Sequence, residues 1–417
     1  MLQSGSYQLG RLLVGAGKSP RALLRLPLDL FRLARSRRKV DRPPGPGSPD
    51  FEAIRHGWSA LADGARSAGE GKMVLLFSGT TYIQGTRGNR PIRQAQALTA
   101  HGAFVFFSYH RSRFADGLPV PSTDHLLQSP VDITIQLLSE IAATDLPTCN
   151  KLFVISYPYP GIERFVAVFR QQGWTTVYDC RDDWEEFAKV GMARWFDAKV
   201  EHQILSEVDV TLCVSRPLVE KMRSLAPSAR VELMPNAVEA GFLPDGYLRQ
   251  PQCQPRRVGY FGHLSSAWFD WDALAQIASN RPDYRFEIIG HSAPQDLALP
   301  KNVHLLGPVP WEELHAYAAC WSAGIIPFRM GKLADAVDPI KIYEYLAFGL
   351  PVVSFRMPQI ENYPYTTTVE TVDAFCEALD RACATETRRD VIEVFLARNT
   401  WDSRAKELLS LPSVKRN

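Results

Sequence analysis

Short apolar runs alternate with stretches of helical periodicity along most of this 417-residue chain. Such runs are typical of strands buried in a parallel sheet, and intervening stretches of about 10–15 residues are typical of the helices that connect them. The alternation stops at residues 250–256, which are rich in Pro and Gln, and then restarts. The predicted strands are 73–77, 103–110, 152–158, 175–180, 208–215 and 230–238 before the break, and 258–262, 284–290, 303–307, 323–328 and 351–355 after it. The sequence therefore predicts an α/β protein with two doubly wound domains.

The length of the chain supports this division, because it is too long for one ordinary core and fits two domains of about 150–200 residues. We expect a first domain over residues 51–245 and a second over 256–387. An amphipathic stretch over 388–417 is expected to cross back to the first domain. Ligands of doubly wound sheets bind at the carboxyl ends of the strands. The cleft between two facing domains is therefore the expected site.

The composition argues against several classes of protein. The chain has seven Cys and no CxxC pair, which fits reduced thiols and speaks against a disulfide framework or a zinc site. It has no run of about 18 apolar residues, as a membrane-spanning helix would need. Its N-terminus lacks the continuous apolar stretch of a secretory signal. No group of acidic residues resembles a Mg²⁺ site, so we expect a protein that uses no metal and no cofactor. Because the thiols are expected to be reduced, we expect a cytoplasmic protein.

The first 42 residues form a basic segment. They contain ten Lys or Arg and two Asp, and Leu and Arg recur at helical spacing between residues 21 and 35. This pattern is typical of a helix that lies on an anionic membrane surface, which would place the protein on the inner face of the plasma membrane. A helix packed on the first domain and a solvated tail are the alternatives. Residues 41–50 are a linker by composition. Because the basic charge is confined to this segment, nucleic acid is not an expected partner.

Residues 338–355 carry the most informative motif. Asp338 and Pro339 are typical of a helix N-cap and first residue, and Gly349 is typical of the position just beyond a helix. Lys341 and Glu344 then lie on one face of the first turns. The N–H groups of a helix N-terminus bind phosphate, and Lys341 adds a full charge. Glu344 has the position to accept hydrogen bonds from the two hydroxyls of a ribose. The alternative is an ordinary surface salt bridge between Lys341 and Glu344.

The same stretch resembles the donor-binding helix of glycosyltransferases with the GT-B fold. The matching residues are Pro339, Lys341, Glu344, Tyr345, Leu346, Ala347, Gly349, Pro351, Val352 and Val353. The resemblance covers about residues 72–410. It implies two facing Rossmann-like domains and a nucleoside-diphosphate sugar as donor, with UDP as the expected nucleotide. The subgroup that it resembles includes bacterial exopolysaccharide and teichuronic-acid transferases and the glucuronosyltransferases of xanthan synthesis.

Two further segments resemble the donor half of this family. Residues 261–271 resemble the loop in which a glycine, here Gly262, lets the backbone approach the diphosphate, and His263 follows it. Residues 302–314 resemble the segment that presents backbone to the base, with Val309 at its centre. The residues expected to bind the donor are Gly262, His263, Asp270, Val309, Asp338, Pro339, Ile340, Lys341 and Glu344.

The acceptor half resembles the family more weakly. Residues 233–242 resemble the segment that ends the first domain, and residues 87–98 resemble an Arg-Pro helix near the acceptor. Arg90 in that helix is a candidate for binding an acceptor phosphate. One departure concerns the mechanism: many retaining members carry an acidic residue eight positions before the ribose-binding Glu, and here that position is Ala336. We therefore expect an inverting mechanism, which needs a base from the first domain.

Three carboxylates follow a predicted strand of the first domain, where the resemblance places the base. Asp182 is the first candidate, Asp183 the second and Asp179 the third. Repulsion among them would raise the pKa of one, which suits a base near neutral pH. The alternative is that Asp182 or Asp183 caps the following helix, and the two residues could also divide these roles.

The expected function is transfer of a sugar to a hydroxyl of a glycan or polyprenyl-linked acceptor, in synthesis of the cell envelope or of an exopolysaccharide. Two alternatives remain at this point. A catalytically inactive scaffold with the same fold is one, and a sugar-nucleotide epimerase is the other.

Overall fold

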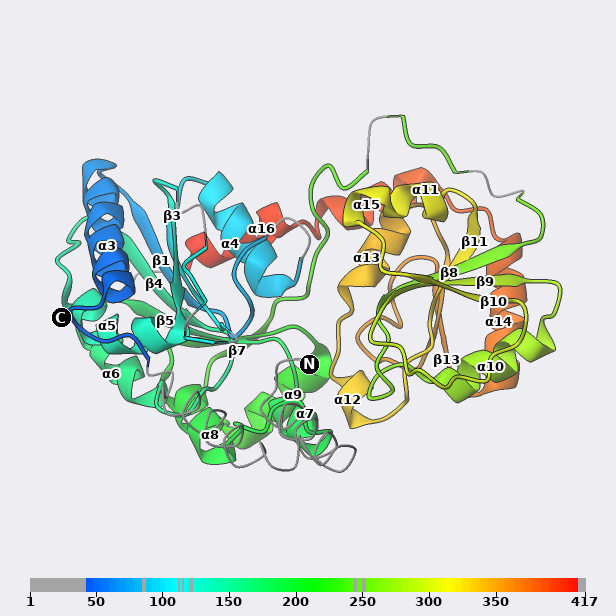
Figure 1. The fold of residues 1–417 in the computed structure, drawn as a ribbon, viewed down its shortest axis with the longest axis horizontal. Coiled ribbons are helices and arrows are strands. Elements are labelled where there is room, and N and C mark those ends of the chain that lie inside the picture. Colours follow the sequence, from blue (N-terminus) through cyan, green and yellow to red (C-terminus); the bar gives the residue numbers. More distant parts are fainter. Residues whose placement is uncertain are drawn as a thin grey trace, which may run out of the picture.

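The computed structural model describes residues 43–84, 88–111, 113–114, 116–119, 123–243, 246–249 and 253–411. The basic segment over residues 1–42, with its predicted membrane-binding helix, lies outside the described residues. Two α/β domains lie side by side, and the chain crosses between them twice (Figure 1).

The first domain contains a seven-stranded parallel sheet with the order β3-β2-β1-β4-β5-β6-β7. Its strands are β1 (Lys72–Phe77), β2 (Phe104–Tyr109), β3 (Leu126–Pro130), β4 (Asn150–Ile155), β5 (Thr175–Cys180), β6 (Val210–Cys213) and β7 (Val231–Leu233). The strand order reverses direction between β1 and β4, and ligands bind beside such a switch point.

Helices cover both faces of this sheet. They are α3 (Pro49–Ser67), α4 (Arg90–Ala100), α5 (Val131–Ala143), α6 (Glu163–Gln171), α7 (Trp184–Lys189), α8 (Ala198–Glu207) and α9 (Arg216–Leu225). In β1, Met73 and Leu75 join the core under α3 and α5, whereas Val74 and Leu76 join the core under α4. Successive side chains of a strand point to opposite faces, so an uninterrupted apolar run fills both cores.

The second domain contains a six-stranded parallel sheet with the order β10-β9-β8-β11-β12-β13. Its strands are β8 (Arg257–His263), β9 (Arg285–His291), β10 (Val303–Gly307), β11 (Trp321–Ile326), β12 (Val352–Phe355) and β13 (Thr366–Val369). Its helices are α10 (Trp271–Asn280), the 3₁₀ turn η1 (Trp311–Glu313), α11 (Leu314–Ala318), α12 (Lys332–Asp335), α13 (Ile340–Ala347) and α14 (Val372–Ala384). The fold class predicted from the sequence is confirmed.

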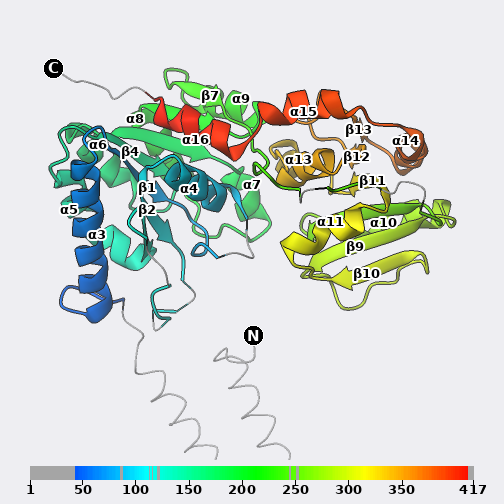
Figure 2. The ribbon, with the colours of Figure 1, turned by 90° about the horizontal axis from the view of Figure 1, so that it is seen from above.

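The chain returns to the first domain through α15 (Arg389–Ala397) and α16 (Trp401–Leu409). Helix α15 lies on α13 of the second domain, and α16 lies on α4 of the first (Figure 2). The two crossings also contact each other, because the Val238 N–H donates to Asn399 O at 3.0 Å and the Trp401 N–H donates to Val238 O at 3.0 Å. The domains are thus connected by two adjacent segments rather than by one tether.

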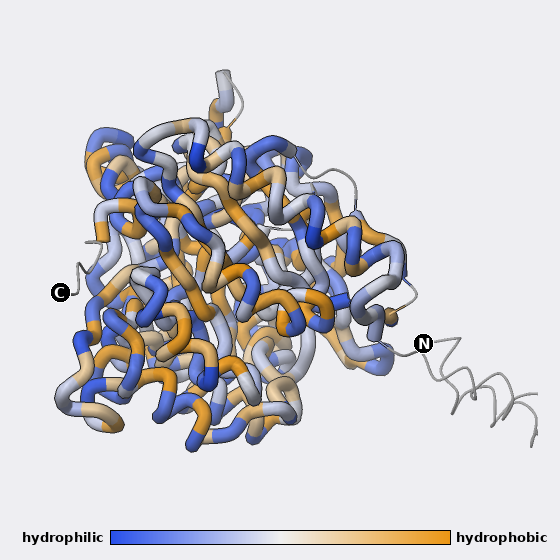
Figure 3. The backbone as a smooth tube through the Cα atoms, turned by 90° about the vertical axis from the view of Figure 1, so that its left-hand side faces the viewer, coloured by the Kyte–Doolittle hydropathy of each residue, from blue (hydrophilic) through white to orange (hydrophobic). Residues whose placement is uncertain are grey.

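Hydropathy alternates along the helices, as expected for helices with one buried face (Figure 3). Within the described residues, no helix is long and apolar enough to cross a membrane. Two strands, β3 and β13, are absent from the sequence prediction. The predicted linker over 41–50 is also too long, because Pro49 and Asp50 already belong to α3, which Ser48 caps.

Candidate active site

Helix α13 lies on the side of the second domain that faces the first (Figure 1). Asp338 does not cap it as predicted: the N-cap residue is Pro339, which makes no side-chain cap. The buried carboxylate of Asp338 instead accepts from the Asn236 N–H at 2.6 Å, the Tyr343 hydroxyl at 2.9 Å and the Tyr363 hydroxyl at 3.1 Å. Burial raises the pKa of Asp338 to about 6. Tertiary partners therefore hold this side chain away from the helix end.

The first turn of α13 consequently keeps unused donors. The N–H groups of Ile340 and Lys341 have no intrahelical acceptor at a helix start, and no described residue accepts from them. The partial positive charge of the helix end is therefore available to an anion.

Lys341 has no acceptor for its ammonium within the described part of the chain. Its Nζ lies 4.7 Å from the ring centroid of Phe328 and 5.4 Å from that of Tyr260. Burial lowers the pKa of Lys341 to about 8, and Glu344 opposes this shift. The predicted alternative, a salt bridge between Lys341 and Glu344, is not formed. The ammonium thus lies against two rings and forms no ion pair within the described part of the chain.

Gly262 lies directly beside this ammonium. A Cβ atom at Gly262 would be 3.3 Å from Cε of Lys341, and the φ angle of Gly262 is +143°. His263 is exposed next to it at the end of β8. The sequence prediction that Gly262, His263 and Lys341 come together is in agreement with this geometry.

Glu344 lies one turn deeper in α13 and is covered by an aromatic ring. Its Oε1 accepts a hydrogen bond from Nε1 of Trp311 at 3.3 Å. Burial raises the pKa of Glu344, while Trp311, Lys341 and Arg93 oppose the shift. Arg93 of the first domain lies over the Trp311 ring, 5.0 Å from its centroid, and pairs with Glu239. The ribose-binding carboxylate predicted from the sequence therefore lies where both domains meet.

Asp270 and Val309 are two other residues predicted to contact the donor. Asp270 caps α10, because its Oδ1 accepts from the Ala273 N–H at 3.1 Å, so a contact to the donor sugar is not supported. Val309 follows β10 and packs against the core of the second domain. Within the described residues its N–H makes no hydrogen bond, which leaves the predicted backbone contact to a base open.

The carboxylates after β5 divide their roles. Asp183 caps α7, accepting from the Glu186 N–H at 3.1 Å, and pairs with Lys221 at 2.7 Å. The Asp182 side chain is 26% exposed, and its Oδ2 lies 3.6 Å from Nε of Arg181. Burial raises the pKa of Asp182 to about 6. Asp183 is therefore held by the helix cap and by Lys221, whereas the side chain of Asp182 pairs only with Arg181 within the described part of the chain.

Arg90 does not face an acceptor as predicted. Its guanidinium is buried and donates to both oxygens of Asp179, with the shortest distance, 2.7 Å, from Nη2 to Oδ1. Its Nη1 donates to the carbonyl of Pro235 and to Oδ1 of Asn236, each at 3.2 Å. Arg90 and Asp179 are thus structural partners, and neither is available to a substrate.

Comparison with known proteins identifies the second domain. Residues 255–385 match the family described as Glycosyl transferases group 1. A protein of Bacillus subtilis (strain 168) that carries the name teichuronic acid biosynthesis glycosyltransferase TuaH is 23% identical over 291 residues, which are 63% of this chain and 72% of the relative.

Solved structures show the same fold. Sucrose-phosphate synthase from Thermosynechococcus elongatus superposes with a TM-score of 0.59 at 15% identity, covering 81% of this chain and 97% of that chain. WaaG, a glycosyltransferase of lipopolysaccharide biosynthesis, superposes with a TM-score of 0.56 at 13% identity, covering 82% of this chain and 100% of that chain. The chain is a glycosyltransferase of the GT-B fold.

In this glycosyltransferase the family match covers the second domain, which contains Gly262, Lys341 and Glu344. Asp182 lies outside the matched residues, so its role as a base stays a prediction. The membership of the xanthan glucuronosyltransferase subgroup also stays a prediction.

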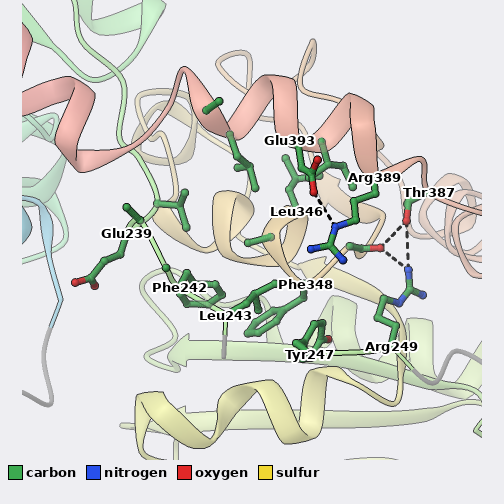
Figure 4. Close-up of a pocket in the computed structure, with 18 of the residues that line it drawn as sticks. Glu239, Phe242, Leu243, Tyr247, Arg249, Leu346, Phe348, Thr387, Arg389 and Glu393 are labelled. Carbon is green, nitrogen blue, oxygen red and sulfur yellow. Dashed lines mark hydrogen bonds and ion pairs between the residues drawn. The ribbon is translucent and has the colours of Figure 1, made fainter. Parts of the chain in front are cut away.

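The glycosyltransferase also has an apolar cavity of about 700 Å³, which lies at the opposite end of α13 (Figure 4). Phe242, Tyr247 and Phe348 line one side of it. Two of its arginines already have partners: Arg389 donates to Glu393 at 2.8 Å, and Arg249 donates to the Gly349 carbonyl at the end of α13. The cavity is therefore separate from the start of α13, where Lys341 and the unused N–H groups lie.

Proposed function

We propose that the glycosyltransferase moves a sugar from a UDP-sugar to a hydroxyl of a glycan or polyprenyl-linked acceptor during synthesis of a cell-envelope or exported polysaccharide. The Bacillus subtilis relative, whose name refers to teichuronic acid, supports the class of product. The observation that carries the donor assignment is the unpaired Lys341 ammonium beside the open N-terminus of α13.

The choice of UDP has separate support. An Escherichia coli structure described as trehalose-6-phosphate bound with UDP-2-fluoro glucose superposes with a TM-score of 0.53 at 12% identity. In the proposed complex, the diphosphate lies between Gly262 and Lys341, and the ribose hydroxyls donate to the free oxygen of Glu344. These contacts use the N–H groups and the charge that the protein leaves unpaired.

The proposed reaction is a single inverting displacement. Asp182 removes the proton of the acceptor hydroxyl as the oxygen attacks the anomeric carbon, and the bond to the UDP oxygen breaks. Negative charge grows on the diphosphate, where Lys341 and the first-turn N–H groups of α13 stabilise it. Preorganised hydrogen-bond donors of this kind stabilise the charge without a metal ion. We therefore propose a metal-independent reaction.

The inverting outcome rests on Ala336. Its side chain is buried, and its carbonyl accepts from Ser215 Oγ of the first domain at 2.7 Å. No carboxylate therefore occupies the position that many retaining members fill with an acidic residue, whereas Asp182 offers a base from the opposite domain.

Membrane association is a separate part of the proposal. The basic segment over residues 1–42 would hold the enzyme on an anionic surface, where a polyprenyl-linked acceptor is available. Removing these residues should abolish co-flotation with vesicles that contain phosphatidylglycerol, while UDP affinity is kept. Equal co-flotation of the full and shortened chains would contradict this part.

Calorimetric titration with UDP, GDP, TDP and ADP tests the donor proposal. We expect micromolar binding of UDP and a loss of about 2 kcal/mol in Lys341→Ala, as for the loss of a charge-assisted contact. Lys301→Ala is the matched control, because Lys301 is exposed just before β10, at the opposite ends of the strands. If the folded protein binds none of the four nucleotides, the proposed function is wrong.

A further inference from the structure

Two histidines end neighbouring strands of the donor domain in register. Strands β8 and β9 pair in parallel, with Gly262 opposite Gly290 and His263 opposite His291. The two imidazole rings lie with their centroids 5.1 Å apart at an angle of 74°. Both side chains are exposed at the carboxyl edge of the sheet, which is the edge where α13 begins.

The backbone beneath the rings requires glycine. A Cβ at Gly290 would lie 1.9 Å from the carbonyl oxygen of Gly262, and the φ angle of Gly290 is +155°. This close approach holds the two strand ends together and so places the two rings side by side. Ser292, with a φ angle of +69°, has its Oγ 3.0 Å from Nδ1 of His291. The other ring nitrogen of His291 is left for a ligand.

The charges that face His263 are all basic. His291 on β9 and Lys341 on α13 both oppose protonation of its ring, in addition to partial burial, and together they lower its pKa. The remaining polar neighbour is Tyr260, whose hydroxyl donates to the His263 carbonyl at 3.1 Å. Glu344 on α13 opposes the lowering of the Lys341 pKa, but no carboxylate of the described chain forms an ion pair with any of these three basic groups. Such a group of like charges is unfavourable until an anion joins it.

We infer that His263 and His291 bind the donor diphosphate as protonated imidazoles, so that the enzyme takes up protons when the nucleotide binds. The inference rests on the proposed function, because the nucleotide supplies the anion. Lys341, with a pKa of about 8, would already be mostly charged at pH 7 before the nucleotide binds. The paired rings would gain their charge when the nucleotide binds. Nucleotide affinity should therefore rise as the pH falls, by up to about tenfold per pH unit for each proton taken up.

Calorimetry in buffers of different ionisation enthalpy tests this inference. UDP is titrated at pH 7.5 into the wild type, His263→Asn, His291→Asn and the double variant, and the proton uptake is obtained from the dependence of the heat on the buffer. UDP itself exchanges a proton in this range, but its contribution is common to all titrations. The difference between wild type and variant thus reports the protein alone. His202→Asn is the control, because His202 is exposed on α8 of the first domain.

We expect each single variant to take up fewer protons than the wild type and the double variant to take up the fewest. Between pH 8 and pH 6, UDP affinity should then rise less in the double variant than in the wild type. Equal proton uptake in the wild type and the double variant, with UDP still bound, would overturn the inference and leave the proposed function standing. Absence of UDP binding to the folded wild type would overturn both.

Discussion

Asn236 donates two hydrogen bonds to Asp338 across the domain boundary. The Asn236 N–H donates to the Asp338 carboxylate at 2.6 Å, and the Asn236 side-chain amide donates to the Asp338 carbonyl at 2.5 Å. Asn236 also accepts from Arg90, which holds Asp179 at the end of β5. One continuous buried network therefore runs from the strand that precedes the candidate base to the start of the donor helix.

The first prediction concerns the stability of this network. Asp338→Ala removes the acceptor of the Asn236 N–H and of the Tyr343 and Tyr363 hydroxyls, and only one of these hydroxyls can then donate to the other. We expect the free energy of unfolding to fall by about 2–4 kcal/mol, as for several unsatisfied buried donors. Chemical denaturation at pH 7.5 measures the change. Asp283→Ala, which removes an exposed carboxylate before β9, should leave the unfolding free energy within about 0.5 kcal/mol of the wild type.

The second prediction separates the two neighbouring carboxylates. Asp182→Asn should lower the rate of UDP release in the presence of acceptor by about 10²–10⁴-fold, because it removes the base, while UDP affinity stays unchanged. Asp183→Asn should keep the rate within a few-fold, because the amide still caps α7, and should lower the unfolding free energy by about 1 kcal/mol through loss of the ion pair with Lys221. If Asp183→Asn abolishes turnover in a fully folded enzyme and Asp182→Asn does not, the assignment is reversed.

The third prediction concerns the pH dependence of kcat/KM. Asp182 must be ionised to accept a proton, so activity should fall as the pH drops below its pKa of about 6. Lys341 must be protonated to bind the diphosphate, so kcat/KM should also fall as the pH rises above its pKa of about 8. The result is a bell-shaped profile.

Lys341→Arg distinguishes the origin of the alkaline side, because an arginine stays charged at these pH values. The variant should keep the fall below pH 6 and lose the fall above pH 8, whatever its absolute rate. An unchanged alkaline side in this variant would assign that titration to another group.

The fourth prediction concerns the ring over the ribose carboxylate. Trp311→Phe removes the Nε1–H that bonds Glu344 but keeps an aromatic ring beside Arg93. If this bond orients Glu344 towards the ribose, discrimination between UDP and 2′-deoxy-UDP should weaken by about fivefold, which corresponds to about 1 kcal/mol. Titration of both nucleotides into both proteins measures the ratio. A ratio that the substitution does not change would assign Trp311 to packing alone.

The donor half could be predicted from the sequence because its signals are local. Lys341 and Glu344 lie on one short helix. The apolar runs of the inner strands predict buried strands of a parallel sheet. The strands that were missed, β3 and β13, lie at sheet edges, where their Gln, Ser and Thr residues carry no apolar signal.

Long-range partners account for the wrong predictions. Asp338 and Pro339 form a typical N-cap pair, but two tyrosines and Asn236 compete successfully for the carboxylate. Arg90 looks like an anion-binding residue, yet its partner Asp179 is 89 positions away in the chain. Nothing local in a sequence distinguishes a buried arginine from an exposed one. In the same way, the contacts of Trp311 with Glu344 and Arg93 are visible only in the structure.

The return of the chain through α16 has a consequence for biosynthesis. Ala405, Leu408 and Leu409 of α16 fill the same core as Val74 and Ile92, which come early in the chain. The ribosome therefore releases the last pieces of the first domain only after the whole second domain has been made. Until then one face of the seven-stranded sheet stays incompletely covered, so the nascent enzyme exposes an apolar surface for most of its own translation.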